Sequence, residues 1–143
     1  MTKKILVTED LVAEGIESLT ERGFQVDVLI EPTPEALIGA IAPYDGLIVH
    51  PNTQVTTALL DAAENLKLIG RAGVTVANID IDAATERGII VCNAPNSNVI
   101  SAAEHTMALL LAAARHIPEA SASMNAGQWR RADFMGSELY GKT

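Results

Sequence analysis

Residues 66–93 read LKLIGRAGVTVANIDIDAATERGIIVCN and contain one complete strand–helix–strand unit. The apolar runs Lys67–Ile69 and Ile89–Cys92 predict the two strands. Between them, Asp82 is the predicted N-cap of a short helix, which Gly88 ends. Strands joined through a helix lie parallel, because a parallel pair needs a long crossover connection. The segment therefore predicts an α/β architecture with a parallel sheet.

The same alternation of strand and helix patterns precedes this segment. Helical periodicity predicts helices over residues 11–22, 34–41 and 57–63. Their predicted N-caps are Asp10, Thr33 and one of Thr56 and Thr57. The strands that alternate with them are predicted at Lys4–Val7, Gln25–Leu29 and Gly46–Val49. Five short, mostly apolar strands alternating with helices indicate an open, doubly wound sheet that is covered on both faces.

The pattern changes after the fifth strand, where a polar loop leads into a long helical stretch. A capping box from Ser101 to Glu104 predicts the start of this helix, and Pro118 ends it. A second helix, rich in small residues, follows and is closed by Gly127. Helices this apolar need a partner surface to bury their apolar face. We therefore expect two parts, a sheet domain of residues 1–97 and a helical arm of residues 98–143.

The composition narrows the range of partners. The 143 residues include 18 acidic and 10 basic side chains, a formal net charge of −8, and only 3% are aromatic. This balance, without a Lys/Arg stripe, argues against nucleic acid and against an anionic membrane. No stretch reads as a signal peptide or a membrane span, and the single cysteine, Cys92, is predicted to be a buried, reduced thiol. We expect a cytoplasmic protein whose partners are small molecules or copies of itself.

Short motifs alone do not identify a cofactor site. The sequence has no G-x-G-x-x-G and no P-loop motif. A metal site is not predicted, because His105 and His116 would lie roughly 16 Å apart along one helix at 1.5 Å rise per residue.

The polar loops that leave the strands are the better candidates for a site. They cover residues 50–53, 70–73 and 93–98, and ligands of doubly wound sheets bind at the carboxyl ends of strands. Arg71 offers a bidentate fork, and Gly73 allows its backbone amide to approach a ligand closely. The combination predicts a small anionic ligand, although a plain tight turn with a solvated Arg71 would show the same pattern.

Several segments together carry a family resemblance. They include LIGRAGV (residues 68–74), NAP (93–95), SAAEHT (101–106), FMG (134–136) and GKT (141–143). The chain resembles the NAD-dependent D-2-hydroxyacid dehydrogenases, and among them the members that act on 3-phosphoglycerate. The resemblance implies a flavodoxin-like substrate domain over residues 1–97. It also implies that residues 98–143 open the cofactor domain and help to build a homo-oligomer, most simply a dimer.

The resemblance also implies roles for particular residues. Arg71, Gly73 and Asn98 would contact the substrate carboxylate and phosphate, with Ala72 contributing through its backbone. Val74 would lie beside the nicotinamide end of NAD. His50 stands where the family usually offers an arginine to the substrate. Arg131 would reach the site of a neighbouring subunit, and a solvated surface arginine is the alternative interpretation.

The family's nucleotide-binding glycines and its catalytic arginine, glutamate and histidine follow the Gly-Lys-Thr of residues 141–143. The resemblance therefore predicts no catalytic residue within these 143 residues and an isolated chain without turnover. Thr75 and Ala77 also depart from the family, which generally has Gly and Asp at these positions.

Three alternatives remain open at this stage. A neutral His50 lends no charge to a phosphate near pH 7, which leaves another 2-hydroxy acid as substrate. The acidic pair Glu9-Asp10 after the first strand resembles that of a receiver-like signalling domain, which has the same architecture. Such a domain also needs an Asp and a Lys where this chain has His50 and Asn93. The chain could also be an assembly module that folds and dimerises without catalysis.

Overall fold

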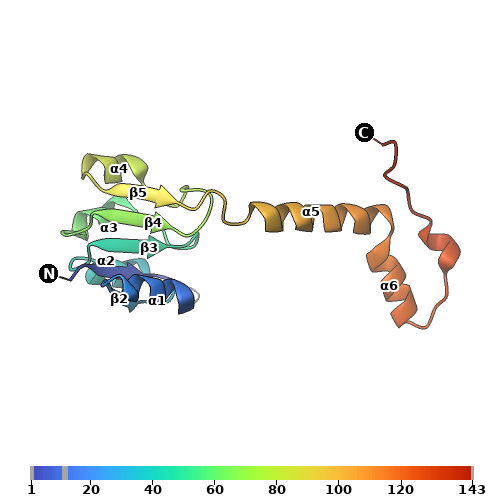
Figure 1. Ribbon diagram of the computed structural model, residues 1–143, viewed down its shortest axis with the longest axis horizontal. Helices are drawn as coiled ribbons and strands as arrows, with labels where there is room; N and C mark the ends of the chain where they lie inside the picture. Colours follow the sequence, from blue (N-terminus) through green and yellow to red (C-terminus); the bar gives the residue numbers. More distant parts are fainter. Residues whose placement is uncertain (1, 11–12, 143) are drawn as a thin grey trace. The chain divides into compact units, whose positions relative to one another are not determined.

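The computed structural model describes residues 2–10 and 13–142 and contains one five-stranded parallel sheet. The strand order is β2-β1-β3-β4-β5 (Figure 1). The strands are β1 (Lys4–Val7), β2 (Gln25–Val28), β3 (Gly46–Val49), β4 (Leu68–Arg71) and β5 (Ile90–Asn93). All four pairings are parallel. The predicted α/β fold class with a doubly wound sheet is confirmed.

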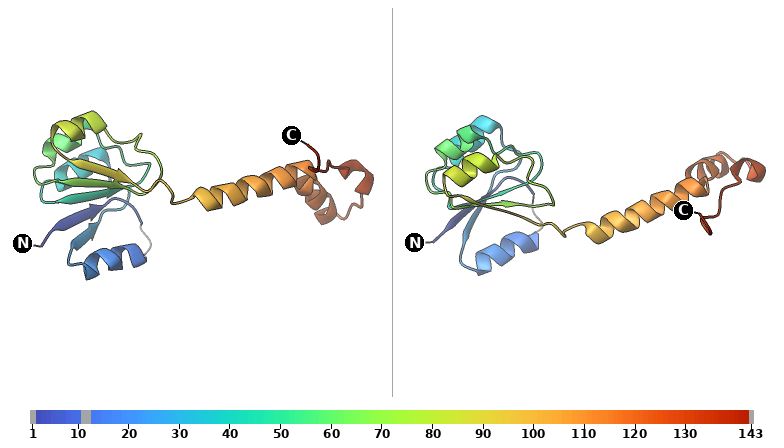
Figure 2. Two further views of the ribbon diagram at one scale, coloured as in Figure 1. Left: turned by 45° about the horizontal axis from the view of Figure 1, so that its top comes forward. Right: turned by 90° about the horizontal axis from the view of Figure 1, so that it is seen from above.

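Four helices connect these strands. They are α1 (Ala13–Glu21), α2 (Pro34–Ala40), α3 (Thr57–Ala62) and α4 (Ile81–Glu86). Figure 2 shows α1 on one face of the sheet and α2, α3 and α4 on the other. The predicted start of the first helix at residue 11 lies outside the described residues.

Two of the predicted N-caps are confirmed, and a third is wrong. The Thr33 hydroxyl accepts from the Ala36 amide, and the Thr56 hydroxyl accepts from the Leu59 amide, as N-caps do. The predicted cap Asp82 is wrong, because Asp80 caps α4 and accepts from the Ala83 amide at 3.0 Å.

The hydrophobic core lies between the sheet and the three helices on one face. Its buried members come from all the central elements of the sheet domain: Leu6, Leu37, Ile41, Leu47, Val49, Val55, Leu59, Leu60, Ala63, Leu66, Ile69, Ile79, Ala83, Ala84 and Ile89. Strand β5 forms one edge of the sheet, and Cys92 on it is exposed. The prediction of a buried thiol is therefore wrong, because an edge strand has a neighbour on one side only.

The chain divides into two compact units, residues 1–97 and residues 98–143. The second contains α5 (Val99–Ala114), α6 (Ile117–Asn125) and the 3-10 helix η1 (Arg131–Phe134). His116 adopts a left-handed φ of 51° between α5 and α6, and Gly127 follows α6 with a φ of 71°. The long helix does not start at the predicted capping box from Ser101 to Glu104. It begins at Val99, and the N-cap residue, Asn98, makes no side-chain capping bond.

The second unit has little buried surface of its own. Helix α5 has no buried residue, and α6 buries only Ser123. Among the described residues, no helix is long and apolar enough to span a bilayer.

Candidate functional site

The candidate site lies where the strands of the first unit end. Strands β1, β3 and β4 are neighbours and run parallel, so the loops after Val7, Val49 and Arg71 meet at one edge of the sheet. Of the predicted site residues, His50 follows β3, and Ala72, Gly73 and Val74 follow β4. Arg71 itself is the last residue of β4, two residues beyond the predicted strand end at Ile69.

Arg71 and Gly73 are packed against each other. A Cβ atom at Gly73 would overlap the Nη1 atom of Arg71, so the guanidinium occupies the space that a side chain there would need. Gly73 also has a φ of 156°, which other residues rarely adopt. The Nε atom of Arg71 is buried and has no hydrogen-bond partner in the part of the chain that the structure describes. An unpaired buried donor calls for an explanation, and an incoming anion would supply the acceptor.

The backbone amides of this loop donate to neighbouring carbonyls. The Ala72 amide donates to Val49 O at 2.9 Å, and the Gly73 amide donates to Arg71 O at 2.8 Å. Both amides thus have backbone acceptors in this structure, and the predicted contact of Gly73 with a ligand stays a prediction. The glycine is required because Arg71 packs over it, and the guanidinium is the group of this loop that offers donors.

His50 is paired with the carboxylate of Glu9, a contact that the sequence did not predict. Its Nδ1 atom lies 2.9 Å from Oε2 of Glu9, which follows β1. The Glu9 side chain is 18% exposed and the His50 side chain 46% exposed. The other carboxylate oxygen, Oε1 of Glu9, is buried and has no hydrogen-bond partner among residues 2–10 and 13–142. The ends of the three neighbouring strands thus carry one carboxylate and one imidazole that are in contact, and one guanidinium on the adjacent strand.

A polar network holds these loops in place. The Asn78 side-chain amide donates to His50 O at 3.0 Å and to Thr53 O at 2.7 Å. The hydroxyls of Thr8 and Thr53 lie 3.0 Å apart, and Thr8 is fully buried. The Asn78 carbonyl in turn accepts from the Val55 amide. Because these bonds satisfy the loop backbone, the position of His50 is set by the fold.

The loop after β4 is fixed from the side of β5 as well. The Asn93 side-chain amide donates to Val74 O at 2.5 Å, and the Ala94 amide donates to Gly73 O at 2.9 Å. Val74 therefore has a defined position with its side chain partly exposed. Sequence reasoning did not predict these contacts of Glu9, Asn78 and Asn93, since their partners lie 19 to 41 residues away.

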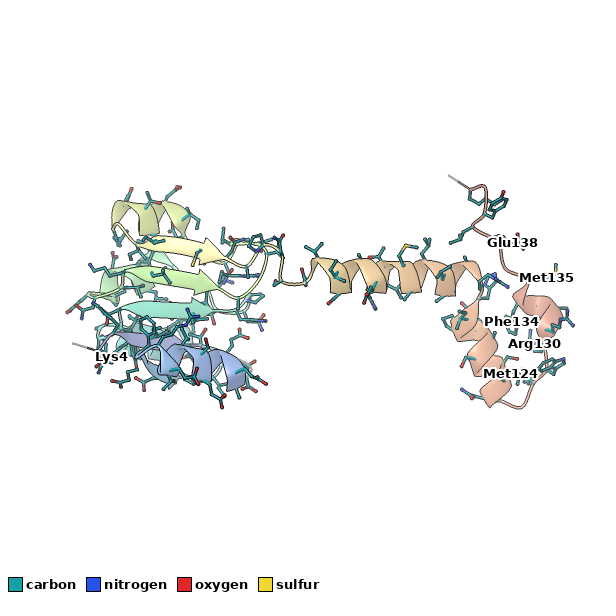
Figure 3. All side chains as sticks on the ribbon, in the orientation of Figure 1. Lys4, Met124, Arg130, Phe134, Met135 and Glu138 are labelled. Carbon is teal, nitrogen blue, oxygen red and sulfur yellow. The ribbon has the colours of Figure 1, made fainter. Side chains whose placement is uncertain are left out.

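The remaining two candidates, Asn98 and Arg131, belong to the second unit. Asn98 precedes α5, and Arg131 begins η1. Arg131 also lines a cavity of about 240 Å³ together with Met124, Arg130 and Phe134. Figure 3 shows these last three side chains around α6 and the segment that follows it. The roles of Asn98 and Arg131 stay predictions.

The chain belongs to the family of D-isomer specific 2-hydroxyacid dehydrogenases, whose catalytic domain matches residues 5–138. This membership agrees with the resemblance found in the sequence and rules out the receiver-like alternative. The D-3-phosphoglycerate dehydrogenases of Methanocaldococcus jannaschii and Archaeoglobus fulgidus are 54% and 50% identical to it over 140 residues. Each match covers 98% of this chain but 26% and 27% of the relative, so the chain spans about a quarter of their length.

A solved structure supports the same assignment of the fold. The NAD⁺-bound 3-phosphoglycerate dehydrogenase of Entamoeba histolytica superimposes with a TM-score of 0.71 at 28% identity. The match covers 80% of this chain and 40% of that protein.

Proposed function

We propose that this chain forms the substrate-binding part of a D-3-phosphoglycerate dehydrogenase. Such an enzyme oxidises 3-phosphoglycerate to 3-phosphohydroxypyruvate with NAD, a step that supplies serine biosynthesis. The observation that carries the proposal is the Arg71 guanidinium, which lies over Gly73 at the carboxyl edge with its buried Nε unpaired. The names of the relatives at 50–54% identity support this substrate over other 2-hydroxy acids.

Each predicted site residue has a role in this proposal. Arg71 binds the substrate carboxylate, since a guanidinium pairs with two oxygens at once. Ala72 and Gly73 shape the loop that lets Arg71 lie there, and His50 faces the phosphate. Asn98 and, from a neighbouring subunit, Arg131 would add further contacts to the anion.

The residues present fit one end of NAD only. Val74 is 40% exposed and offers an apolar side chain, which suits a nicotinamide ring. The 143 residues contain no glycine-rich loop for the pyrophosphate, so the dinucleotide would be held mainly by a further domain. NAD, when bound, accepts a hydride from the substrate. This chain's own contribution is to bind and orient the anion, which brings the reacting carbon into position.

A titration tests whether the edge of the sheet binds this anion. We expect 3-phosphoglycerate to shift the amide resonances of residues 50–53 and 71–75 in a saturable way, more strongly than D-lactate does. Equal or stronger shifts with D-lactate would favour the alternative that His50, a neutral imidazole, selects an unphosphorylated 2-hydroxy acid. No shift with either ligand would favour an assembly module without a substrate site.

An activity test uses the chain joined, after residue 143, to the remainder of the Methanocaldococcus jannaschii relative. We expect this hybrid to form NADH with 3-phosphoglycerate, and the chain alone to form none. Arg71→Met should lower kcat/KM of the hybrid by about tenfold to a hundredfold, the usual cost of a charged contact. The matched control is Arg87→Met, because Arg87 pairs with Asp61 and lies after α4. An equal loss in both variants would contradict the proposal.

The second unit is proposed to mediate a homo-oligomer. Helix α5 exposes a run of large apolar side chains: Val99, Ile100, Met107, Leu109, Leu110 and Leu111. An apolar surface of this extent marks an interaction site in most proteins. A second copy of the same helix is the simplest partner. For a metabolic enzyme of this kind, the cytoplasm is the proposed location, which subcellular fractionation would test.

A further inference from the structure

We propose that Glu9 is a positioning residue for His50 and makes anion binding at this edge depend on the uptake of a proton by His50. The inference rests on the proposed function, because the anion is taken to be the substrate. It goes further in assigning Glu9 a role and in stating how the site compensates for the arginine it lacks.

The contact between the two residues is built into the fold. Oε2 of Glu9 lies 2.9 Å from Nδ1 of His50, and the carboxylate is largely buried. Thr8, which precedes Glu9, bonds through its backbone amide to Ile48 O at 3.1 Å and through its hydroxyl to Thr53. Asn78 holds the carbonyl of His50 from the other side. Hydrogen bonds to neighbouring residues therefore hold the backbone at Glu9 and at His50 independently of the contact between their side chains.

The chemistry of the contact determines what the imidazole can offer to a ligand. A carboxylate only accepts hydrogen bonds, so the proton of a neutral His50 resides on Nδ1. The other nitrogen, Nε2, then carries a lone pair and repels the oxygen of an anion. His50 can donate to an anion through Nε2 only when both nitrogens carry protons. Glu9 thus fixes the tautomer of the neutral imidazole. In that tautomer, His50 can donate to an anion through Nε2 only if it also takes up a proton.

The charges around His50 also make anion binding depend on the protonation of His50. From the side of β1, Glu9, Asp10 and Glu14 in the first turn of α1 are acidic. From the side of β4, Arg71 is the basic group, and residues 51–56 after β3 carry no charged side chain. With a neutral imidazole, Glu9 offsets the charge of Arg71. The proton on His50 supplies the net positive charge that a doubly charged anion needs.

The test uses inorganic sulfate, which keeps its two charges between about pH 5.5 and pH 8, so that only the protein titrates. Sulfate binding to the chain is measured by calorimetry in buffers of different ionisation enthalpy, which yields the number of protons taken up. We expect the affinity to fall by up to about tenfold per pH unit in the upper part of this range. Uptake should approach one proton per sulfate there.

Four variants separate positioning from structure. Glu9→Gln should bind sulfate with clearly less than one proton taken up and with less change in affinity across this pH range, because an amide can donate to Nδ1 and leave the proton of a neutral imidazole on Nε2. Glu9→Asp keeps the charge and should restore the proton-linked profile. The matched control Asp10→Asn removes a neighbouring charge that is not paired with His50 and should leave the profile unchanged. His50→Arg should bind tightly at every pH with no proton uptake.

The outcomes distinguish this inference from the proposed function. Sulfate that binds through Arg71 with no proton uptake, or a Glu9→Gln variant that still takes up one proton per sulfate, overturns the role of Glu9 and leaves the anion site standing. Absence of any sulfate binding overturns both. A hybrid without NADH formation, in the presence of proton-linked sulfate binding, contradicts the dehydrogenase alone.

Discussion

The guanidinium of Arg71 occupies the space that a side chain at position 73 would need. Residue 73 is therefore a glycine because Arg71 packs against it, and not because a turn requires one. This packing also explains why Arg71 is held near the loop backbone while its Nε has no partner. A site of this kind is organised before its ligand arrives, which lowers the ordering cost of binding.

We predict that Gly73→Ala destabilises the chain by about 1–3 kcal/mol and weakens sulfate binding, because the methyl group displaces Arg71 and the backbone must leave its φ of 156°. Urea unfolding and calorimetry measure the two effects. Gly88→Ala is the control, since Gly88 also has a positive φ, of 67°, but has nothing near its Cβ position. It should cost about 1 kcal/mol and leave sulfate binding intact.

Arg71→Met should leave the free energy of unfolding unchanged within about 0.5 kcal/mol, because its Nε makes no hydrogen bond that could be lost. Arg87→Met should lower it by about 1 kcal/mol, since Arg87 donates to Ala83 O at 2.7 Å and pairs with Asp61. Urea midpoints measure both. A large loss for Arg71→Met would assign the residue a structural role and weaken the case for an anion site.

At the scale of elements, the caps of the helices set the positions of the loops. Asp80 caps α4 with one oxygen and accepts from the Thr57 hydroxyl at 2.7 Å with the other, so that a single side chain joins the starts of α3 and α4. These bonds, first that from the Ala83 amide and then that from Thr57, hold the pKa of Asp80 below its ordinary value.

The lowered pKa of Asp80 predicts an acid-dependent stability. The folded chain favours the ionised form, so this contribution is present at neutral pH and is lost as the pH falls below the ordinary value of 3.8 and through the lower folded pKa. Asp80→Ala should lower the urea midpoint at pH 7 and less so at pH 3. Asp82→Ala, in the first turn but not the cap, should change little. Equal effects of the two substitutions would contradict the role of Asp80.

The elements also show which features the sequence could predict. Strands such as Gly46–Val49 and the Thr33 cap were predicted correctly, because their signals are local. Asp80 precedes α4 and Asp82 lies in its first turn, only two residues later, and the bond from Thr57, 23 residues away, gives no local signal in favour of Asp80. The pairing of Glu9 with His50 joins the ends of two neighbouring strands and has no local pattern at all. Arg71 was found from its type and position, but its unpaired Nε required the packed structure.

At the scale of the whole molecule, the two units differ in how they are stabilised. The hydrophobic core comes entirely from residues 6–89, whereas α5 buries no residue. A chain ending at Ser97 should therefore keep its urea midpoint within the equivalent of about 0.5 kcal/mol of the full chain. A clearly lower midpoint would show that the arm contributes to the fold of the sheet domain.

The proposed oligomer makes a separate prediction. Leu110→Glu should raise the dissociation constant between copies by about tenfold or more, because a charge would replace a large apolar group in the interface. Sedimentation equilibrium measures the constant. Ile30→Glu, at an exposed apolar position of the sheet domain, should leave it unchanged. Weakening by both substitutions would place the interface elsewhere.

The strand order has a consequence for how the molecule is made. After β3 has paired with β1, each later strand adds to the edge that the preceding one exposes, β4 on β3 and then β5 on β4. Growth in this direction follows the order of synthesis, so the nascent chain can complete its sheet once residue 93 has left the ribosome. The sheet domain can thus fold completely while residues 98–143 are still emerging. The apolar arm is then already attached to a folded domain when it first contacts a partner.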